Sequence, residues 1–320
     1  MRSRSALITV IICLVLVPLL STCSQTSDPR VTSTPVELPS PTDDGFPRVD
    51  GSTSTAPMGA MIVCTMMEVP CEWVTFVDGN RYLMPDLTGY QGDFPGIGHH
   101  GTHSAYLNLI NGEADLILVA RSPSMEELEL AQLSGVEFDI RPVALDAFVF
   151  IANENNPVDG LSLNEIQRIY TGELTNWDQV GGPQGEIHPY QRDEQSGSQQ
   201  LMLSLVMKDL SMVDAPLLVL LKMIAPFYAI SEDPQGIGYS VYYYEEYMGP
   251  SEKIKLLAVD GIKPDHESIQ TRRYPFTSEV YMVVRADSPP TSIARRLRDW
   301  LLSPAGQEMV ERSGYVPIQD

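Results

Sequence analysis

The sequence predicts an α/β protein large enough for about two domains, and three observations support this fold class. The chain has 320 residues, a length typical of two domains. Hydrophobic residues make up 43% of it, which is enough to build real cores and excludes disorder of the whole chain. From residue 46 onward, short apolar runs alternate with stretches of helical periodicity, as in α/β architectures.

The N-terminal residues are predicted to direct export. Arg2 and Arg4 precede an apolar stretch, residues 6–20, whose length and order are those of a secretory signal rather than a membrane span. Residues 24–45 are rich in Ser, Thr, Pro and Asp, so we expect a flexible tether there and a folded part that begins near Phe46. No later apolar run approaches the roughly 20 residues that cross a bilayer, which predicts a soluble body.

Two of the four cysteines lie in or next to the predicted signal, and the other two lie in the predicted folded part. Cys13 lies in the signal, and Cys23 follows it in a context that resembles a bacterial lipoprotein signal, in which the cysteine is lipidated and becomes the first residue of the mature chain. Thr22 departs from that pattern, and an ordinary signal peptide is the alternative. Cys64 and Cys71 remain, and in an oxidising compartment we expect a local disulfide worth roughly 2–3 kcal/mol. The alternative is a buried pair of free thiols.

Several secondary-structure elements have recognisable signals. Strands are predicted at residues 115–120, 147–152, 187–191 and 279–285. Helices are predicted to begin at two capping boxes and at one serine followed by proline, namely Ser124 with Glu127, Ser162 with Glu165, and Ser303 with Pro304.

Two apolar or aromatic segments are predicted to pack in the interior. The apolar run 216–224 is too short for a membrane span, so we expect a buried helix of about nine residues. The aromatic cluster is predicted to pack against a sheet or helix rather than to stack on a sugar, and its members are Tyr239, Tyr242, Tyr243, Tyr244 and Tyr247.

A hydroxyl- and glycine-rich turn leads directly into a predicted helix at three places. Residues 50–55 precede a helix to about Met67, residues 101–104 open a helix that ends near Asn111, and residues 196–198 open one that reaches about Lys208. A helix start presents unpaired backbone N–H groups and roughly half a positive charge. The repeated device therefore predicts a site for an anion.

Two arginines follow predicted strands close to these turns. Arg121 closes the strand 115–120 and Arg192 closes the strand 187–191, and a guanidinium offers a planar fork that matches two oxygens of an oxyanion. The plainer alternative is that each turn is an ordinary N-cap and each arginine a surface ion pair.

The charge balance narrows the choice of ligand. The formal net charge is −21, and it becomes −23 when a signal carrying two arginines and no acid is removed, which excludes nucleic acid as a partner. A small anion is still allowed, because exposed carboxylates farther than about 8–10 Å away are screened at physiological salt.

Several motifs, in order along residues 46–320, resemble the PstS-like solute-binding proteins of phosphate ABC transporters, which are type II members of the periplasmic binding protein superfamily. The motifs are DGSTST (50–55), NGEADLILVARSPS (111–124) and QRDEQSGSQ (191–199), with support from residues 156–182, 235–240, 274–284 and 301–318.

This resemblance implies a two-lobed protein with the anion between the lobes. Each lobe is an α/β sheet, and two crossover strands join them, here expected near Phe148 and Val280. Lobe one is then 46–147 plus 278–320, and lobe two is 148–277. Hinge closure would trap the ligand and present it to the permease subunits of the transporter. We expect a monomer without cofactor, held to the membrane on its extracytoplasmic face by the lipid alone.

The resemblance also implies ligand positions. They are Ser52, Thr53, Ser54, Thr102, Arg192, Ser196, Gly197 and Ser198, with Arg121 included from its place after a strand. Glu194 is expected to steer Arg192. Some family members carry at position 121 an aspartate that accepts the proton of hydrogen phosphate, and arginine accepts no proton, so Asp50 and Glu194 are the candidate acceptors. Phosphate is the first choice, and sulfate or molybdate and tungstate are the alternatives.

Other functions are less favoured. His99, His100 and His103 fall within five positions, but no further metal ligand is evident, so we expect them to flank the second turn. Neither G-x-S-x-G nor H-E-x-x-H occurs, which argues against a hydrolase. A surface lipoprotein that senses or scavenges phosphate without a permease stays open as an alternative.

Overall fold

The computed structural model describes residues 36–40, 45–88, 96–250 and 252–318. The predicted signal of residues 1–22 and the lipidation site Cys23 lie outside these residues. Part of the predicted tether is described, and it already contacts the body, because Leu38 packs against the main core and Pro39 is buried. The compact unit includes residues from Val36 onward, about ten residues before Phe46, where the fold is predicted to begin.

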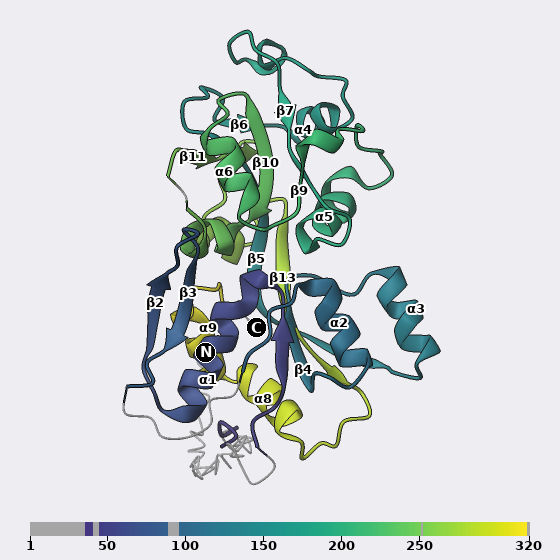
Figure 1. The fold of residues 1–320 in the computed structure, drawn as a ribbon, viewed down its shortest axis with the longest axis vertical. Coiled ribbons are helices and arrows are strands. Elements are labelled where there is room, and N and C mark those ends of the chain that lie inside the picture. Colours follow the sequence, from purple (N-terminus) through teal and green to yellow (C-terminus); the bar gives the residue numbers. More distant parts are fainter. Residues whose placement is uncertain (1–35, 41–44, 89–95, 251, 319–320) are drawn as a thin grey trace, which may run out of the picture. The chain divides into compact units, whose positions relative to one another are not determined.

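The core of this unit is a seven-stranded mixed sheet (Figure 1). Its order is β1–β4–β13–β5–β10–β7, with β11 also paired to β5. The β1–β4 and β10–β7 pairs are parallel and the other pairs antiparallel. The strands are β1 (Val49–Gly51), β4 (Leu116–Val119), β5 (Phe138–Asn153), β7 (His188–Pro189), β10 (Gly236–Val241), β11 (Ile254–Leu256) and β13 (Thr277–Arg285).

Strand β5 changes its partners halfway along its length. Residues 138–147 pair with β13, whereas residues 148–152 pair with β10 and residues 151–153 with β11. In Figure 1, β5 and β13 run between two groups of elements, one containing β1 to β4 and the other β6, β7, β10 and β11. The predicted strand 147–152 covers only the end of β5, because Asp139, Arg141 and Pro142 hide the strand pattern of its exposed beginning.

The remaining strands form three pairs: β2 (Cys71–Thr75) with β3 (Arg81–Pro85), β6 (Gly160–Leu161) with β12 (Ala258–Val259), and β8 (Gln191–Arg192) with β9 (Val219–Leu220). The α-helices are α1 (Ala56–Met67), α2 (Thr102–Ile110), α3 (Met125–Leu133), α4 (Leu163–Tyr170), α5 (Gly197–Leu201), α6 (Ala225–Ser231), α7 (His266–Gln270), α8 (Ile293–Leu301) and α9 (Pro304–Arg312). The predicted capping boxes at Ser124 and Ser162 are both present, and Ser303 caps α9.

Two predicted elements differ from the structure. The predicted strand 187–191 is split into β7, which pairs with β10, and β8, which pairs with β9. The predicted buried helix 216–224 is wrong. Residues 216–218 form a 3₁₀ turn and β9 follows, with Leu217 and Leu221 exposed by 95% and 75%. Pairing with β8 holds this segment extended, which a helix would not allow.

The predicted packing of the tyrosines is confirmed. Tyr239, Tyr243 and Tyr244 are buried, and the Tyr243 ring stacks on Tyr315 with ring centroids 3.7 Å apart. These rings belong to the main core, which continues through β5 and β10. Among the described residues, no helix has the length and apolar character to cross a membrane.

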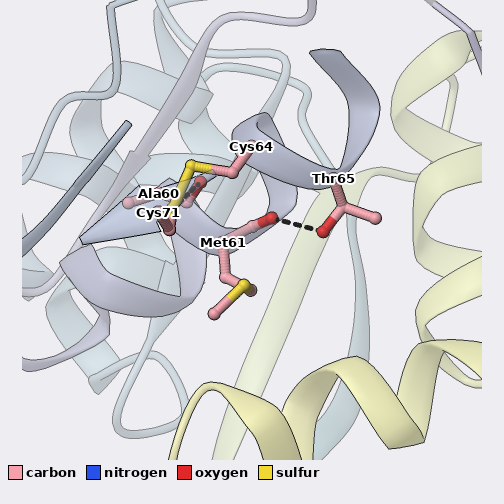
Figure 2. The surroundings of a disulfide bond; sticks show 5 residues. All are labelled: Ala60, Met61, Cys64, Thr65 and Cys71. Atoms are coloured by element: carbon pink, nitrogen blue, oxygen red, sulfur yellow. Dashed lines mark hydrogen bonds between the residues drawn. A yellow bond between two sulfur atoms is a disulfide. The ribbon is translucent and has the colours of Figure 1, made fainter. Parts of the chain in front are cut away.

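The predicted disulfide is present. Cys64 on α1 is bonded to Cys71 at the start of β2, with Cα atoms 5.9 Å apart (Figure 2). Near it on α1, the Thr65 hydroxyl donates to the Met61 carbonyl over 2.7 Å. The bond ties the β2–β3 hairpin to the helix that follows the first hydroxyl-rich turn.

Candidate anion-binding site

A cavity of about 450 Å³ lies where the three hydroxyl-rich turns meet. Both groups of elements contribute to its wall, which is lined by Ser52, Thr53, Ser54, Asp78, Asn80, Tyr82, His99, His100, Gly101, Thr102, His103, Ser104, Ala120, Arg192, Asp193, Gln195, Ser196, Gly197, Ser198, Leu201, Leu221, Lys222, Met223, Ile224, Val241 and Tyr244. The structure thus brings together every ligand position predicted from the sequence except Arg121.

The first turn joins β1 to α1 through a 3₁₀ turn, Thr53–Thr55. The Ser52 N–H and the Thr55 hydroxyl both donate to the Leu118 carbonyl, over 2.9 and 2.7 Å, which fixes the turn against the end of β4. The Ser52 and Ser54 hydroxyls lie 3.2 Å apart and both residues line the cavity. Neither the 3₁₀ turn nor α1 receives a side-chain cap.

The second and third turns face each other. Gly101 has φ +98°, a conformation that favours glycine, and its N–H donates to the Gly51 carbonyl of the first turn over 3.1 Å. A Cβ placed on Gly197, at the start of α5, would lie 2.7 Å from the Thr102 hydroxyl at the start of α2. Glycine at 197 therefore allows the two helix starts to approach closely.

The helix starts at the cavity differ from the others in their capping. Serines at the starts of α3, α4, α8 and α9 and an aspartate at α7 each accept a backbone N–H of their own helix. The α-helices that begin at the cavity, α1, α2, α5 and α6, have no such bond. Ser196 precedes α5 and carries a suitable oxygen but leaves it unused as a cap. In α6 the N–H groups of Ala225 and Phe227 donate to the carbonyls of Lys222 and Ile224, and in α1 the N–H of Ala56 donates to the carbonyl of Thr53. Among the described residues, the first-turn N–H groups of α2 and α5 have no partner and are left for another acceptor.

Arg192 brings a buried positive charge to the wall. Its guanidinium donates to the carbonyls of Leu220 and Leu221 over 2.9 and 3.3 Å, and the nearest carboxylate, that of Asp193, lies 3.8 Å away. Burial lowers the pKa of Arg192, partly offset by the charge of Asp193, but an arginine stays protonated in proteins. The charge is thus only weakly compensated by the protein.

Arg121 lies outside the cavity wall, contrary to the prediction that it faces the anion. Its guanidinium donates to both oxygens of Glu127 over 2.8 Å, and both side chains are buried. It lines a neighbouring cavity of about 210 Å³ instead. Burial alone would raise the pKa of Glu127, but hydrogen bonds and charge from Arg121, together with bonds from Ser124 and His103, hold that pKa below the ordinary value.

The two predicted supporting carboxylates also sit away from the wall. Asp50 is buried behind the first turn and accepts hydrogen bonds from Gly51, Asn108 and both the backbone and ring of His100. Glu194 is exposed and makes no described contact with Arg192, so Asp193 takes the place predicted for it. Neither Asp50 nor Glu194 lines the cavity as the predicted acceptor would.

Sequence reasoning missed three contributions to the wall. The tip of the β2–β3 hairpin supplies Asp78 and Asn80, and Asn80 accepts a hydrogen bond from Tyr244 of the opposite group of elements. Lys222 adds a second cation. It is the only charged residue in the apolar run 216–224. A lysine there was a signal against a fully buried helix, and the sequence interpretation did not use it.

The three neighbouring histidines do line the cavity, as expected for residues that flank the second turn. Among the described residues, no cluster of His, Cys, Asp or Glu has the arrangement of a metal site. The hydroxyls, helix starts and two cations form a wall rich in hydrogen-bond donors, which suits an oxyanion rather than a cation.

Comparison with known proteins agrees with this chemistry. The family described as the PBP superfamily domain matches residues 87–305. The protein SphX of Synechococcus elongatus is 25% identical, over 69% of this chain and 68% of its own length. The phosphate-binding protein PstS of Borreliella burgdorferi is 26% identical, over 66% and 75%, and that of Bacillus subtilis is 24% identical, over 56% and 57%.

Solved structures share the fold. A Clostridium perfringens protein solved with bound phosphate, a candidate substrate-binding protein of a phosphate ABC transporter, superposes with a TM-score of 0.64 at 21% identity, covering 85% of this chain and 99% of that one. An ABC-type phosphate transport receptor from Vibrio cholerae gives 0.61 at 19% identity, with the same coverage. The fold is that of type II periplasmic binding proteins, as expected from the sequence.

Proposed function

The chain belongs to the PBP superfamily, and we propose that it binds inorganic phosphate in the cavity between its two lobes as the substrate-binding protein of an ABC transporter. It is a binding protein rather than an enzyme, as are its PstS relatives. One observation carries the proposal: the α-helix starts left without side-chain caps are those that begin at the cavity. At two of them, α2 and α5, the first-turn N–H groups have no partner among the described residues, and an oxyanion can accept several hydrogen bonds at once.

The energetics favour a small, highly charged anion. Hydrogen bonds to charged groups contribute about 1.5–3 kcal/mol each, so about six to ten of them can supply the roughly 8 kcal/mol of micromolar binding and also offset ordering costs. Arg192 and Lys222 supply positive charge at the wall, and within the described part of the chain no carboxylate lies within hydrogen-bond distance of buried Arg192. A neutral ligand would leave that charge uncompensated.

The proposed function also includes a location, in which the protein is held outside the cytoplasm and delivers phosphate to a permease. Residues 1–22 act as the signal, Cys23 carries the lipid, and the following residues tether the body to the extracytoplasmic face of the membrane. Lobe one comprises residues 46–147 and 278–320, and lobe two residues 148–277. The change of partner of β5 between Ala147 and Phe148 supports this boundary. Closure about β5 and β13 would present the loaded form to the permease subunits.

Calorimetric titration after removal of bound ligand tests the ligand. We expect phosphate and arsenate to bind with a Kd in the micromolar range or below, and sulfate and molybdate at least about tenfold more weakly. Sulfate binding as tight as phosphate binding would remove the phosphate assignment and leave a general oxyanion-binding protein. Failure of all four anions to bind would remove the anion site itself.

A further inference from the structure

The wall contains two histidines whose rings are fixed by buried carboxylates. His103 lies in the first turn of α2, and its Nδ1 is 3.0 Å from Glu127; His100 makes the same kind of contact with Asp50, also at 3.0 Å. The two differ in exposure, since the His103 side chain is 20% exposed and that of His100 is 67% exposed. Water competes less for the ring of His103.

The partners of Glu127 decide which nitrogen of His103 carries hydrogen. Glu127 accepts two hydrogen bonds from Arg121 and one from the Ser124 N–H, an environment that favours the carboxylate anion. A carboxylate only accepts hydrogen bonds, so Nδ1 of His103 must donate. In the neutral ring, Nε2 is then an acceptor, and it has no hydrogen-bond partner among the described residues.

An acceptor has a specific use in a wall that is rich in donors. The N–H groups, hydroxyls and cations there would hold the bare oxygens of any tetrahedral oxyanion. Hydrogen phosphate also carries a P–OH group, which must donate, whereas sulfate carries no proton at neutral pH. An acceptor at the wall therefore forms a hydrogen bond with the P–OH group of hydrogen phosphate. The same acceptor faces an oxygen lone pair of sulfate and repels it.

Building on the proposed function, we propose that Nε2 of His103 accepts the proton of hydrogen phosphate and so makes the cavity selective for protonated oxyanions over sulfate. The position fits this role, because His103 follows Thr102, whose hydroxyl meets the start of α5. Of the two carboxylates at the wall, Asp78 accepts two hydrogen bonds from Asn80, and Asp193 lies 3.8 Å from the guanidinium of Arg192. A neutral ring also avoids the repulsion that a carboxylate would exert on a dianion.

This assignment gives Arg121 an indirect role. The arginine that lies outside the cavity wall holds Glu127, and Glu127 holds the ring of His103, so the three side chains form a chain that ends at the wall. Arg121 and Glu127 are positioning residues, and His103 is the residue that would touch the ligand.

Titration of the His103→Asn protein tests the assignment in mildly alkaline buffer. The asparagine amide can replace Nδ1 as the donor to Glu127 but lacks the atom that reaches the ligand. We expect at least about tenfold weaker binding of both phosphate and arsenate, which carry the same proton, and tighter binding of sulfate, because the opposing lone pair is removed. His103→Gln extends an amide toward the Nε2 position that can turn either its oxygen or its NH₂ to the ligand. It should retain phosphate affinity within about threefold and bind sulfate more tightly.

A matched control separates this role from a general one. His188 also places Nδ1 on a carboxylate, 2.7 Å from Asp233, but does not line the cavity, so His188→Asn should leave all affinities unchanged. Retained selectivity in both folded His103 variants would overturn the assignment while the phosphate function stands. If the Asn variant does not fold, the Gln variant decides alone. Absence of phosphate binding in the natural protein would overturn both proposals.

Discussion

The cavity and the flank formed by α3 use the same residue types in opposite ways. At the flank, Ser124 caps α3 and Glu127 neutralises Arg121, so the donors find partners within the protein. At the cavity, Ser196 leaves its helix start uncapped, and the only partners of the Arg192 guanidinium among the residues that the structure describes are two carbonyls and a sulfur. A group whose partner is internal contributes to stability, whereas a group without one is available to a ligand.

The largest expected effect belongs to the flank. Arg121→Ala leaves the carboxylate of Glu127 buried without its main partner, so we expect a loss of about 3–5 kcal/mol in the free energy of unfolding, measured by urea denaturation at pH 7. The double variant Arg121→Met with Glu127→Leu removes both charges and should recover most of that loss.

The pH dependence of the same pair provides a check. Because the pKa of Glu127 is lower in the folded protein than the ordinary 4.5, its contribution to stability is complete above that value and is lost as the pH falls through the folded-state pKa. Glu127→Gln should flatten this acid limb of the stability curve. A loss below about 1 kcal/mol in Arg121→Ala would show that the flank does not depend on the pair.

At the cavity, Arg192→Ala should act on affinity. Removing a guanidinium that offers charged hydrogen bonds worth about 1.5–3 kcal/mol each should weaken phosphate binding at least tenfold, as measured by calorimetry. The fold should remain intact, because the pair with Asp193 is long and burial of the charge is itself unfavourable. Arg141→Ala is the control, since that exposed arginine lies outside the cavity. Unchanged phosphate affinity in Arg192→Ala would show that the cavity is not the phosphate site.

Gly197→Ala tests whether the close approach of two helix starts at the cavity is needed for binding, because it changes no charge. The new methyl group would meet the Thr102 hydroxyl at 2.7 Å and separate the starts of α2 and α5, so we expect phosphate affinity to fall by about tenfold. Gly96→Ala is the matched control, because a Cβ there meets nothing within 4 Å. Equal affinities of the two variants would mean that the two helix starts do not act on one ligand.

The smallest effect is expected at Glu194, which the sequence favours as a support for Arg192. Its side chain is exposed and makes no described contact with Arg192, so Glu194→Gln should change phosphate affinity by less than about twofold. A larger effect in calorimetry at physiological salt would restore the predicted role.

Much of the site could be predicted because its signals are local. The hydroxyl-rich turns, the glycines that allow close approach and the nearby cysteines each act over a few residues, and the structure gathers the predicted turns around one cavity. The start of α6 was hidden, since the apolar run 216–224 matches a helix as well as an exposed strand, and Pro226 in the first turn was the available signal. Periodicity cannot separate the two over so short a segment.

By itself, the sequence determined where α1, α2 and α5 begin and which two cysteines lie within reach of each other, since hydroxyl- and glycine-rich turns and chain reach are properties of neighbouring residues. Only the tertiary structure decided which arginine faces the cavity. Arg121 and Arg192 both end strands, but one lies against the buried Glu127 and the other against the carbonyls of Leu220 and Leu221. Whether a charge is neutralised depends on groups brought close by folding, and no local pattern encodes that proximity.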